Sequence, residues 1–537
     1  MARPNTEAIL HYNIIQQFLD QGIKSIFNLQ LVGEHAHCGA NPLESSGFSY
    51  DPQHFMDRGI FFYNFGWACT RRKDYGTPSS NPMLLDMVKV MAFALSEGKA
   101  AVHCHAGLGR TGLFIACYLV YSLRCRPNDA VRYVRHKRHG SIQSQAQIVC
   151  IQKFAQFLLP LFVVYPIQYS KRKPSKADKY RPSKAVDFTL NQYLAKQRKV
   201  AHGLEGRHLR YIPKILYVLC ERMLQLCQVQ TQSSSRRSLS FQLTQLEPFC
   251  KHFLASDRPS SLEEDSSPEE EPSDDYVLDS MLIAGLSGLL SPSSPDYNYD
   301  DEDFEPSEGS SSQEEELITE NACFRELSSQ KELRSIARTT KKTTSEVAEA
   351  LLQDRLILHT RLGQFQKDLN TRASAWDRLN VEEDVSLLAG LLWNWLDELQ
   401  EPVLNRTDLT FVVIRAENPA AVLHKLDRGT RFTTEYLVRF VSRLGLTTVS
   451  ERRNLLRRLT ASLCHQTLQL EPEGQRPLGK TWPRMRDGTA TRVTTFIEGL
   501  YDAVTRHAET PLQNGVYNEE KDKSFHGINI MASAIAR

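Results

Sequence analysis

HCHAGLGRTG, residues 103–112, is the stretch that decides the fold of this chain. It places a cysteine between two histidines, follows it with two glycines in three positions, and ends in Arg-Thr-Gly. Cys104, Gly107, Gly109, Arg110 and Thr111 would coincide by chance on the order of once in ten thousand such chains, at about 5% usage per residue type. Coincidence is therefore a poor explanation for this stretch.

The stretch joins a predicted strand to a predicted helix. KAAVHC (99–104) has the pattern of a strand, and RTGLFIACYLVYSLR (110–124) has the length and apolarity of a buried helix. The backbone N–H groups of 105–110 can turn inward toward three phosphate oxygens, and the helix N-terminus adds positive potential. Gly107 and Gly109 permit the backbone angles that such a loop needs. We therefore interpret the loop as a cradle for phosphate.

The side chains of this loop fit nucleophilic chemistry. Cys104 is the predicted nucleophile, because a helix N-terminus and nearby donors favour the reactive thiolate. Arg110 offers a planar guanidinium that grips two phosphoryl oxygens. Thr111 is expected to donate a hydrogen bond to the thiolate or to help it leave, and His103 to orient the loop from behind. The predicted substrate-binding residues are His105, Ala106, Gly107, Leu108, Gly109 and Arg110.

A cysteine followed after five residues by Arg and Ser or Thr, with a preceding His, resembles the signature of the protein tyrosine phosphatase superfamily. HCHAGLGRTG is most similar to its dual-specificity branch, which includes the Cdc14-like enzymes. The resemblance implies a phosphocysteine intermediate, a phosphoprotein substrate carrying phosphotyrosine and/or phosphoserine and phosphothreonine, and no cofactor or metal. It also suggests a role connected with cilia. His105 and Leu108 make the loop less basic than those of lipid-phosphate relatives, which favours a phosphoprotein.

The resemblance assigns the general acid to Asp74, in KDYGTP, about 30 residues before Cys104. Such an acid protonates the leaving oxygen. Relatives read Trp-Lys-Asp-Tyr-Gly without interruption, whereas ACTRR (68–72) here separates Trp67 from Lys73. An insertion of this length costs little stability, but it can displace the carboxylate.

Supporting residues are assigned by the same resemblance. The SIQSQAQ segment would place the hydrolytic water, with Gln143 or Gln147 as the candidates; the alternative is that both are solvated positions at a helix start. Glu34, in GEHAHCG, would brace Arg110 or would simply be a turn residue. The basic run RYVRHKRHG (132–140) would attract anionic groups or would be a solvated helix face.

The composition limits the cellular compartment and the kinds of partner that we expect for this protein. The 537 residues carry a formal charge of +2, but 259–324 contain about 20 Asp and Glu and no Lys or Arg. Eleven cysteines include no C-x-x-C pair, so neither a structural zinc nor a disulfide framework is predicted. FLLPLFVVYPI (157–167) is too short to span a bilayer. We expect a soluble intracellular protein, cytoplasmic with nuclear or cilium-associated alternatives, that binds no nucleic acid.

The order of predicted elements indicates an α/β fold. Predicted strands at 25–32, 59–66 and 99–104 alternate with helices at 6–20, 82–98 and 110–124, as in a parallel sheet with helices on both faces. A dual-specificity phosphatase-like central sheet flanked by helices is the expected fold class. After this domain we expect a disordered acidic linker and an all-α C-terminal domain.

Composition divides the chain into five predicted regions. These are a phosphatase catalytic domain (1–165), a basic linker and helical extension (166–230), an acidic Ser/Pro-rich disordered linker (231–325), a helical C-terminal domain (326–510) and a tail (511–537). In the helical domain, EEDVSLLAGLLWNWLDELQEPVL (382–404) places an apolar stripe on one helix face, which Pro402 ends. Core packing of an interaction domain is the predicted role of this stripe.

The sequence therefore predicts a cysteine-dependent protein phosphatase. The competing hypothesis is a catalytically impaired scaffold, in which the 68–72 insertion has left the phosphatase domain able only to bind phosphate. In that case protein partners of the helical domain and of the acidic linker would carry the function.

Overall fold

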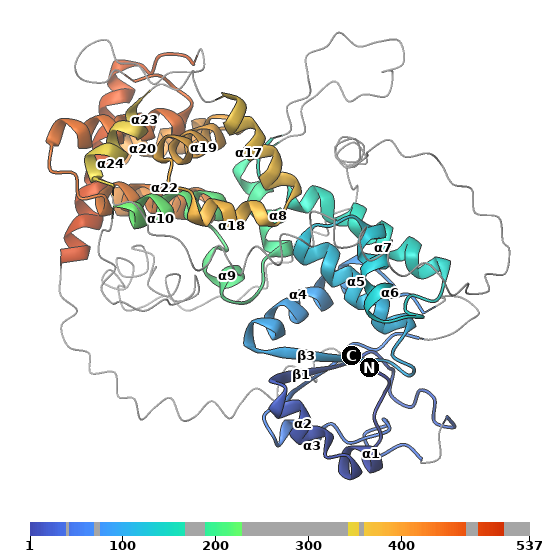
Figure 1. The fold of residues 1–537 in the computed structure, drawn as a ribbon. Helices are drawn as coiled ribbons and strands as arrows, with labels where there is room; N and C mark the ends of the chain where they lie inside the picture. Colours follow the sequence, from blue (N-terminus) through green and yellow to red (C-terminus); the bar gives the residue numbers. More distant parts are fainter. Residues whose placement is uncertain are drawn as a thin grey trace, which may run out of the picture.

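The computed structural model describes residues 1–38, 42–68, 76–166, 188–227, 342–353, 359–468 and 482–509. Figure 1 shows two parts, an α/β part built from the first 162 residues and a helical body. The predicted acidic linker (231–325) and tail (511–537) lie outside the described residues.

Three parallel strands form the sheet of the α/β part. They are β1 (Ile23–Asn28), β2 (Phe61–Asn64) and β3 (Lys99–His103), in the order β2-β1-β3. The predicted α/β fold class with a parallel sheet is confirmed. β1 ends earlier than the predicted strand 25–32. There the Asn28 side chain accepts the Gln30 amide at 3.0 Å, which turns the chain out of the ladder.

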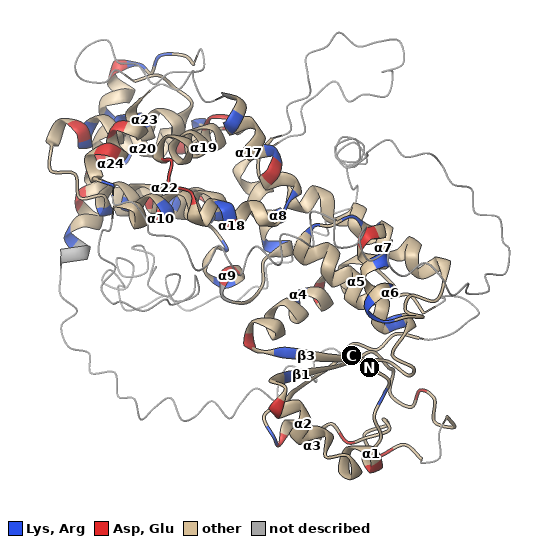
Figure 2. Cartoon of the chain, in the orientation of Figure 1, with Lys and Arg blue, Asp and Glu red and all other residues tan. Residues whose placement is uncertain are grey.

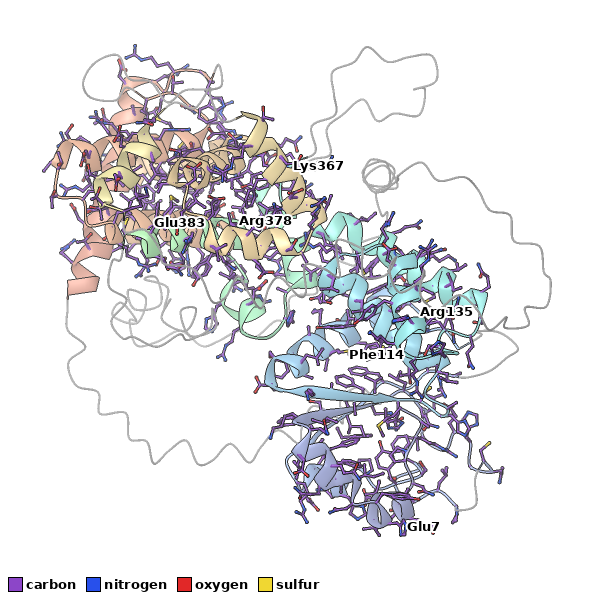
Figure 3. The ribbon with its side chains drawn as sticks, in the orientation of Figure 1. Glu7, Phe114, Arg135, Lys367, Arg378 and Glu383 are labelled. Atoms are coloured by element: carbon purple, nitrogen blue, oxygen red, sulfur yellow. The ribbon has the colours of Figure 1, made fainter. Side chains whose placement is uncertain are left out.

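The two faces of the sheet build two separate cores, because successive side chains of a strand point to opposite faces. Ile26 packs in a core with Ile9 and Phe55. Phe27, its neighbour, lies in the other core, with its ring centroid 5.8 Å from that of Phe114. Figure 3 labels Phe114 between its helix and the strands. The sheet is thus covered by helices on both sides.

The helices of the first face are α1 (Thr6–His11), α2 (Ile14–Asp20) and α3 (Gln53–Met56). Those of the second face are α4 (Asn81–Glu97), α5 (Gly109–Leu123), α6 (Pro127–Lys137) and α7 (Gln145–Leu158), followed by the 3-10 helix η1 (Leu159–Phe162). The single helix predicted over 6–20 is wrong. Asn13 adopts a left-handed conformation with φ of 48°, which asparagine tolerates better than most residues, and it separates α1 from α2.

The helical body joins segments that are far apart in the sequence. Its helices are α8 (Leu190–Val200), α9 (Gly203–His208), α10 (Lys214–Leu226), α16 (Thr344–Leu352), α17 (His359–Thr371), α18 (Ser374–Val381), α19 (Val385–Asp397), α20 (Arg406–Arg415), α21 (Pro419–Lys425), α22 (Arg428–Arg443), α23 (Val449–Cys464) and α24 (Asp487–Glu509). None of the described helices is long and apolar enough to cross a membrane.

One hydrophobic core unites these helices. α10, from the predicted extension 166–230, lies among the C-terminal helices in Figure 1, and Ile215 and Leu219 are fully buried with residues of α19 and α22. The apolar stripe predicted in 382–404 is buried throughout, and α19 ends before Pro402. Residues 188–227 and the C-terminal helices therefore stabilise one another, while the division of the chain into the five regions stays a prediction.

Hydrogen bonds tie the helical body to the segment that follows η1 and to the end of α5. The Asn370 side chain accepts from the amides of Val164 at 2.7 Å and Tyr165 at 2.9 Å, and it donates to the Tyr165 carbonyl at 3.0 Å. Arg124, at the end of α5, donates to the Leu369 carbonyl at 2.7 Å. Since Asn370 and its partners are buried, this junction is a specific contact rather than a loose tether.

Candidate active site

The quoted stretch forms a turn between β3, which ends at His103, and α5, which begins at Gly109. The Leu108 carbonyl accepts the amides of Gly112 at 2.9 Å and Ile142 at 3.3 Å, which anchors the turn to its helix and to the next loop. Gly107 has φ of +75°, and a Cβ there would lie 2.1 Å from the Met1 carbonyl oxygen. Only glycine fits that position.

Cys104 lies at the base of this turn and is buried. The Thr111 hydroxyl donates to its Sγ at 3.2 Å, so the predicted contact between these two side chains is present. A donor at this distance stabilises a thiolate more than a thiol.

His103 lies behind Cys104. Its Nε2 is 2.7 Å from the Tyr50 hydroxyl, and its Nδ1 is 3.3 Å from the Cys104 carbonyl. Burial lowers the pKa of His103 to about 4, so the ring is neutral at pH 7. Tyr50 lies 53 positions away in the sequence, and no local pattern indicated that it would contact this ring.

Arg110 is buried, and its guanidinium is held from one side by Glu34. Its Nη1 and Nη2 donate to the two carboxylate oxygens at 2.8 Å and 2.5 Å. The carbonyls of Leu29 and Trp67 accept from Nη1 at 3.0 Å and 2.9 Å. Planar bidentate pairing of this kind fixes the plane of the guanidinium as well as its position.

Glu34 stays ionised in this pair. Burial alone would raise its pKa, but hydrogen bonds from Arg110 and the Leu31 amide, together with the charge of Arg110, hold the pKa below its ordinary value. The structure thus brings Glu34 against Arg110, as the bracing hypothesis requires. The alternative of a plain turn residue does not account for the two-pronged contact.

Gln143 and Gln147 lie beside the start of α5. A Cβ on Gly109 would be 3.0 Å from Gln147 Nε2 and 3.2 Å from Gln143 Oε1. The Gln143 amide donates to Gln147 Oε1 at 2.9 Å, and the Ser144 side chain caps α7 through the Gln147 amide. Gln147 is buried, so the interpretation as a solvated helix start does not fit it.

Asp74 lies outside the described residues, but both ends of its loop are described. The Trp67 indole donates to the Gly76 carbonyl at 2.9 Å, which closes the base of the loop. A Cβ on Gly76 would lie 3.1 Å from Gln147 Nε2 and 3.7 Å from Arg110 Cγ. The loop that carries Asp74 is therefore rooted directly beside Arg110 and Gln147.

The outer positions of the turn form its rim. Ala106 is exposed, and His105 and Leu108 are half-buried. Burial, then the positive charges of Arg3 and Arg110, lowers the pKa of His105 below its ordinary value, which disfavours a positive charge on this rim side chain.

The basic run 132–140 has a structural role that the sequence analysis missed. Figure 2 shows basic residues gathered on α6, and Arg138, just after that helix, donates to the Gly107 carbonyl at 2.8 Å. Arg135, labelled in Figure 3, donates to the carbonyls of Ser141 and Ile142 at 3.2 Å and 2.8 Å. Both arginines are exposed, as the alternative of a solvated helix face predicts, and they also hold the turn and the glutamine loop through these carbonyls.

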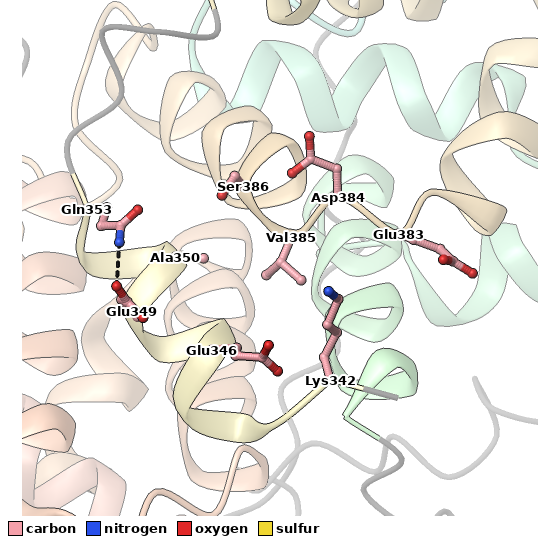
Figure 4. A pocket seen from close by; sticks show the side chains of 9 residues that line it. All are labelled: Lys342, Glu346, Glu349, Ala350, Gln353, Glu383, Asp384, Val385 and Ser386. Carbon is pink, nitrogen blue, oxygen red and sulfur yellow. Dashed lines mark hydrogen bonds between the residues drawn. The ribbon is translucent and has the colours of Figure 1, made fainter. Parts of the chain in front are cut away.

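A hollow of about 420 Å³ lies elsewhere, between α16 and the start of α19 (Figure 4). Its acidic side chains take part in local structure. Glu346 closes a capping box with Thr343, and Asp384 caps α19 and pairs with Arg361 at 2.7 Å. The side chains that line it are Lys342, Glu346, Glu349, Ala350, Gln353, Glu383, Asp384, Val385 and Ser386. They include no cysteine.

Comparison with known proteins agrees with this geometry. The family model described as "Dual specificity phosphatase, catalytic domain" matches residues 82–156, which contain the turn, α5 and both glutamines. Protein tyrosine phosphatase domain-containing protein 1 of Danio rerio is 31% identical over 567 residues, covering 81% of this chain and 77% of that protein. The protein of the same name from Mus musculus is 51% identical over 228 residues, 42% of this chain and 28% of its own length. Dual specificity protein phosphatase CDC14A of Homo sapiens is 36% identical over 93 residues, 17% of this chain and 14% of that one.

The fold, the Cys104–Arg110 turn and these matches define a phosphatase domain of the protein tyrosine phosphatase superfamily. The chain belongs to the protein tyrosine phosphatase domain-containing protein 1 family. The resemblance inferred from the turn is thereby confirmed.

Proposed function

We propose that this protein hydrolyses phosphomonoesters on phosphoproteins through a phosphocysteine intermediate. The observation that carries the proposal is the pairing of a buried Cys104 Sγ, which accepts a hydrogen bond from Thr111, with a guanidinium fixed by Glu34. Together they place a stabilised sulfur nucleophile beside a permanent positive charge at one turn.

The first step transfers the phosphoryl group to sulfur. The Cys104 thiolate attacks phosphorus, an S–P bond forms, and the bond between phosphorus and the leaving oxygen breaks. Asp74 donates its proton to that oxygen. The loop amides and Arg110 hold the three equatorial oxygens, and such preorganised donors are commonly worth about 10²–10³-fold each in rate.

The second step frees the enzyme. Gln143 and Gln147 position a water, the Asp74 carboxylate takes a proton from it, and the water oxygen attacks phosphorus. The S–P bond breaks, inorganic phosphate leaves, and Thr111 stabilises the departing thiolate. Asp74 is then protonated again, ready for the next cycle.

The side chains of the turn favour one substrate class. Half-buried His105 and Leu108 and exposed Ala106 are not permanent cations, and the nearby Arg3 and Arg138 donate to main-chain carbonyls of the loops, which suits a phosphorylated side chain on a protein better than a highly charged inositol lipid. Phosphotyrosine and/or phosphoserine and phosphothreonine are the proposed residues. A cytoplasmic site of action, with nuclear or ciliary association, belongs to the same proposal, as do protein partners of the helical domain and acidic linker.

Hydrolysis of two substrates by the full-length chain tests the proposal: an aryl phosphate with an activated leaving group and a phosphotyrosine peptide. Cys104→Ser should abolish turnover of both. Asp74→Asn should slow the peptide about 10²–10⁴-fold and the activated aryl phosphate far less, because only the peptide's leaving oxygen needs a proton. Asp86→Asn, an exposed carboxylate on α4, is the matched control and should retain wild-type rates.

The scaffold hypothesis predicts a different pattern. The wild-type chain would bind phosphate but turn over neither substrate, and deleting 68–72 would restore activity. Full-length protein is required for these assays because 188–227 share a core with the C-terminal helices.

A further inference from the structure

Three potential metal ligands meet at the rim of the turn, and the side chains of all three are left without a step in the proposed phosphoryl transfer, to which His105 contributes its backbone amide. His35, Cys38 and His105 each offer one ligand atom, and these atoms all lie within 4.8 Å of one another. His35 Nδ1 is 3.5 Å from Cys38 Sγ, and the rings of His35 and His105 stack with centroids 4.2 Å apart. Two loops that are about 70 residues apart in the sequence supply this trio.

Arg3 holds the two loops together. Its backbone amide donates to the His105 carbonyl at 3.0 Å, and its guanidinium donates to the carbonyls of His35, at 3.3 Å, and Cys38. Arg3 thus holds the main chain of all three ligand residues in place, independently of any interaction among their side chains.

Glu34 lies against the other side of His35. Its Oε1 is 3.0 Å from His35 Nε2, an ion-pair distance without hydrogen-bond geometry, so its negative charge favours a proton on that nitrogen over one on Nδ1, which lies 3.5 Å from Cys38 Sγ. Carboxylate partners of this kind set the tautomer and orientation of histidine ligands. The charged groups that face the trio are Glu34, Arg3 and Arg110.

We propose that His35, Cys38 and His105 form a binding site for zinc or a related borderline-soft divalent metal. Two imidazoles and one thiolate are the ligand types that select such ions over magnesium or calcium. In tetrahedral zinc sites, ligand atoms about 2.0–2.3 Å from the ion lie roughly 3.5 Å apart. The three ligand atoms are already near this separation, but one imidazole must turn out of the stack so that the lone pairs of both rings point at the same ion. Cys38 is exposed, which gives an ion a path from solvent, and a fourth position stays open for water.

A bound ion would link the turn that carries Glu34 to the loop that carries Cys104. Because Glu34 fixes Arg110, metal occupancy and the geometry of the phosphate cradle would be coupled. This consequence rests on the proposed function, but the metal site itself does not.

Cobalt spectroscopy of the full-length protein tests the site without requiring turnover. Metal-free protein titrated with Co²⁺ should develop thiolate-to-cobalt charge-transfer absorption and the d–d bands of a tetrahedral complex, and Zn²⁺ should remove both. Cys38→Ser should abolish the charge-transfer band, whereas Cys104→Ser should keep it. A band that survives Cys38→Ser, or that disappears in Cys104→Ser, overturns the proposal.

Histidine variants provide the matched control. His35→Ala and His105→Ala should each raise the dissociation constant for Co²⁺ at least about 10-fold, since even indirect partners of metal ligands are commonly worth that much. His37→Ala, an exposed histidine of the same turn, should leave it unchanged. Equal effects of His35→Ala and His37→Ala would show that the ion does not bind this trio.

Discussion

The two parts of the molecule bury charge in different ways. In the helical body, buried charged side chains pair across helices, as Glu221 does with Arg443 at 2.5 Å and Asp397 with Arg458 at 3.1 Å. In the α/β part, buried polar groups converge on one turn, where Arg110 and Cys104 lie beneath a half-exposed rim.

This difference in buried charge distinguishes a part of the molecule that serves stability from a part that serves chemistry. Each of these ion pairs neutralises its own two charges and stabilises the packing of helices. The groups around Arg110 instead hold a buried guanidinium and a buried sulfur beneath the half-exposed rim of one turn, although burying such groups costs free energy of folding. Variants in the helical body should therefore change stability alone, and variants at the turn should change activity.

Trp395→Ala should have the largest effect on stability. Trp395 is fully buried in α19, with its ring centroid 5.1 Å from that of Tyr193, and its indole donates to the Val164 carbonyl at 2.9 Å. Truncating such a side chain commonly costs about 3–5 kcal/mol of the free energy of unfolding. Chemical denaturation measures the loss. The variant should keep wild-type turnover at temperatures where it stays folded. Loss of turnover at those temperatures would show that the helical body also contributes to activity.

His103 should make the stability of the α/β part pH-dependent. Its pKa is lowered by burial from 6.5 to about 4, so between these values the unfolded chain binds a proton that the folded chain does not. Stability should therefore fall by about 3 kcal/mol as the pH drops from 6.5 to 4. His103→Gln should flatten this slope in denaturant titrations, whereas exposed His54→Gln should leave it intact. An equal slope in His103→Gln would contradict the assignment.

Of the three predicted changes, that of Glu34→Gln should be the smallest. It should appear in the catalytic rate. The amide cannot accept two charge-assisted bonds, so Arg110 loses its fixed plane. We expect kcat/KM to fall about 10- to 100-fold, as for other small misplacements of a catalytic group. Glu97→Gln, at the exposed end of α4, is the control and should behave as wild type. An unchanged kcat/KM would reduce Glu34 to a turn residue.

The local sequence pattern was sufficient to predict much of the α/β fold. The three strands and the helix after the turn were predictable because their periodicity and the Gly-rich motif are properties of neighbouring residues. The break at Asn13 was missed because a left-handed residue interrupts an otherwise continuous helical pattern.

Contacts between distant segments were not predictable in the same way. Tyr50 behind His103, Arg138 on the Gly107 carbonyl, and the shared core of α10 with α19 depend on tertiary packing. His35 and Cys38 carried a signal that was overlooked: H-x-x-C in GEHAHCG has metal-ligand spacing, although its third ligand, His105, comes from elsewhere.

Capture of the covalent intermediate tests the central claim most directly. Gln147→Ala should slow release of the phosphoryl group, so rapid quenching during turnover of an aryl phosphate should trap it. We predict that peptide mass spectrometry will find one added phosphoryl group on the peptide carrying Cys104, and none in Cys104→Ser. Turnover without an adduct on Cys104, or an adduct on another residue, would contradict the account.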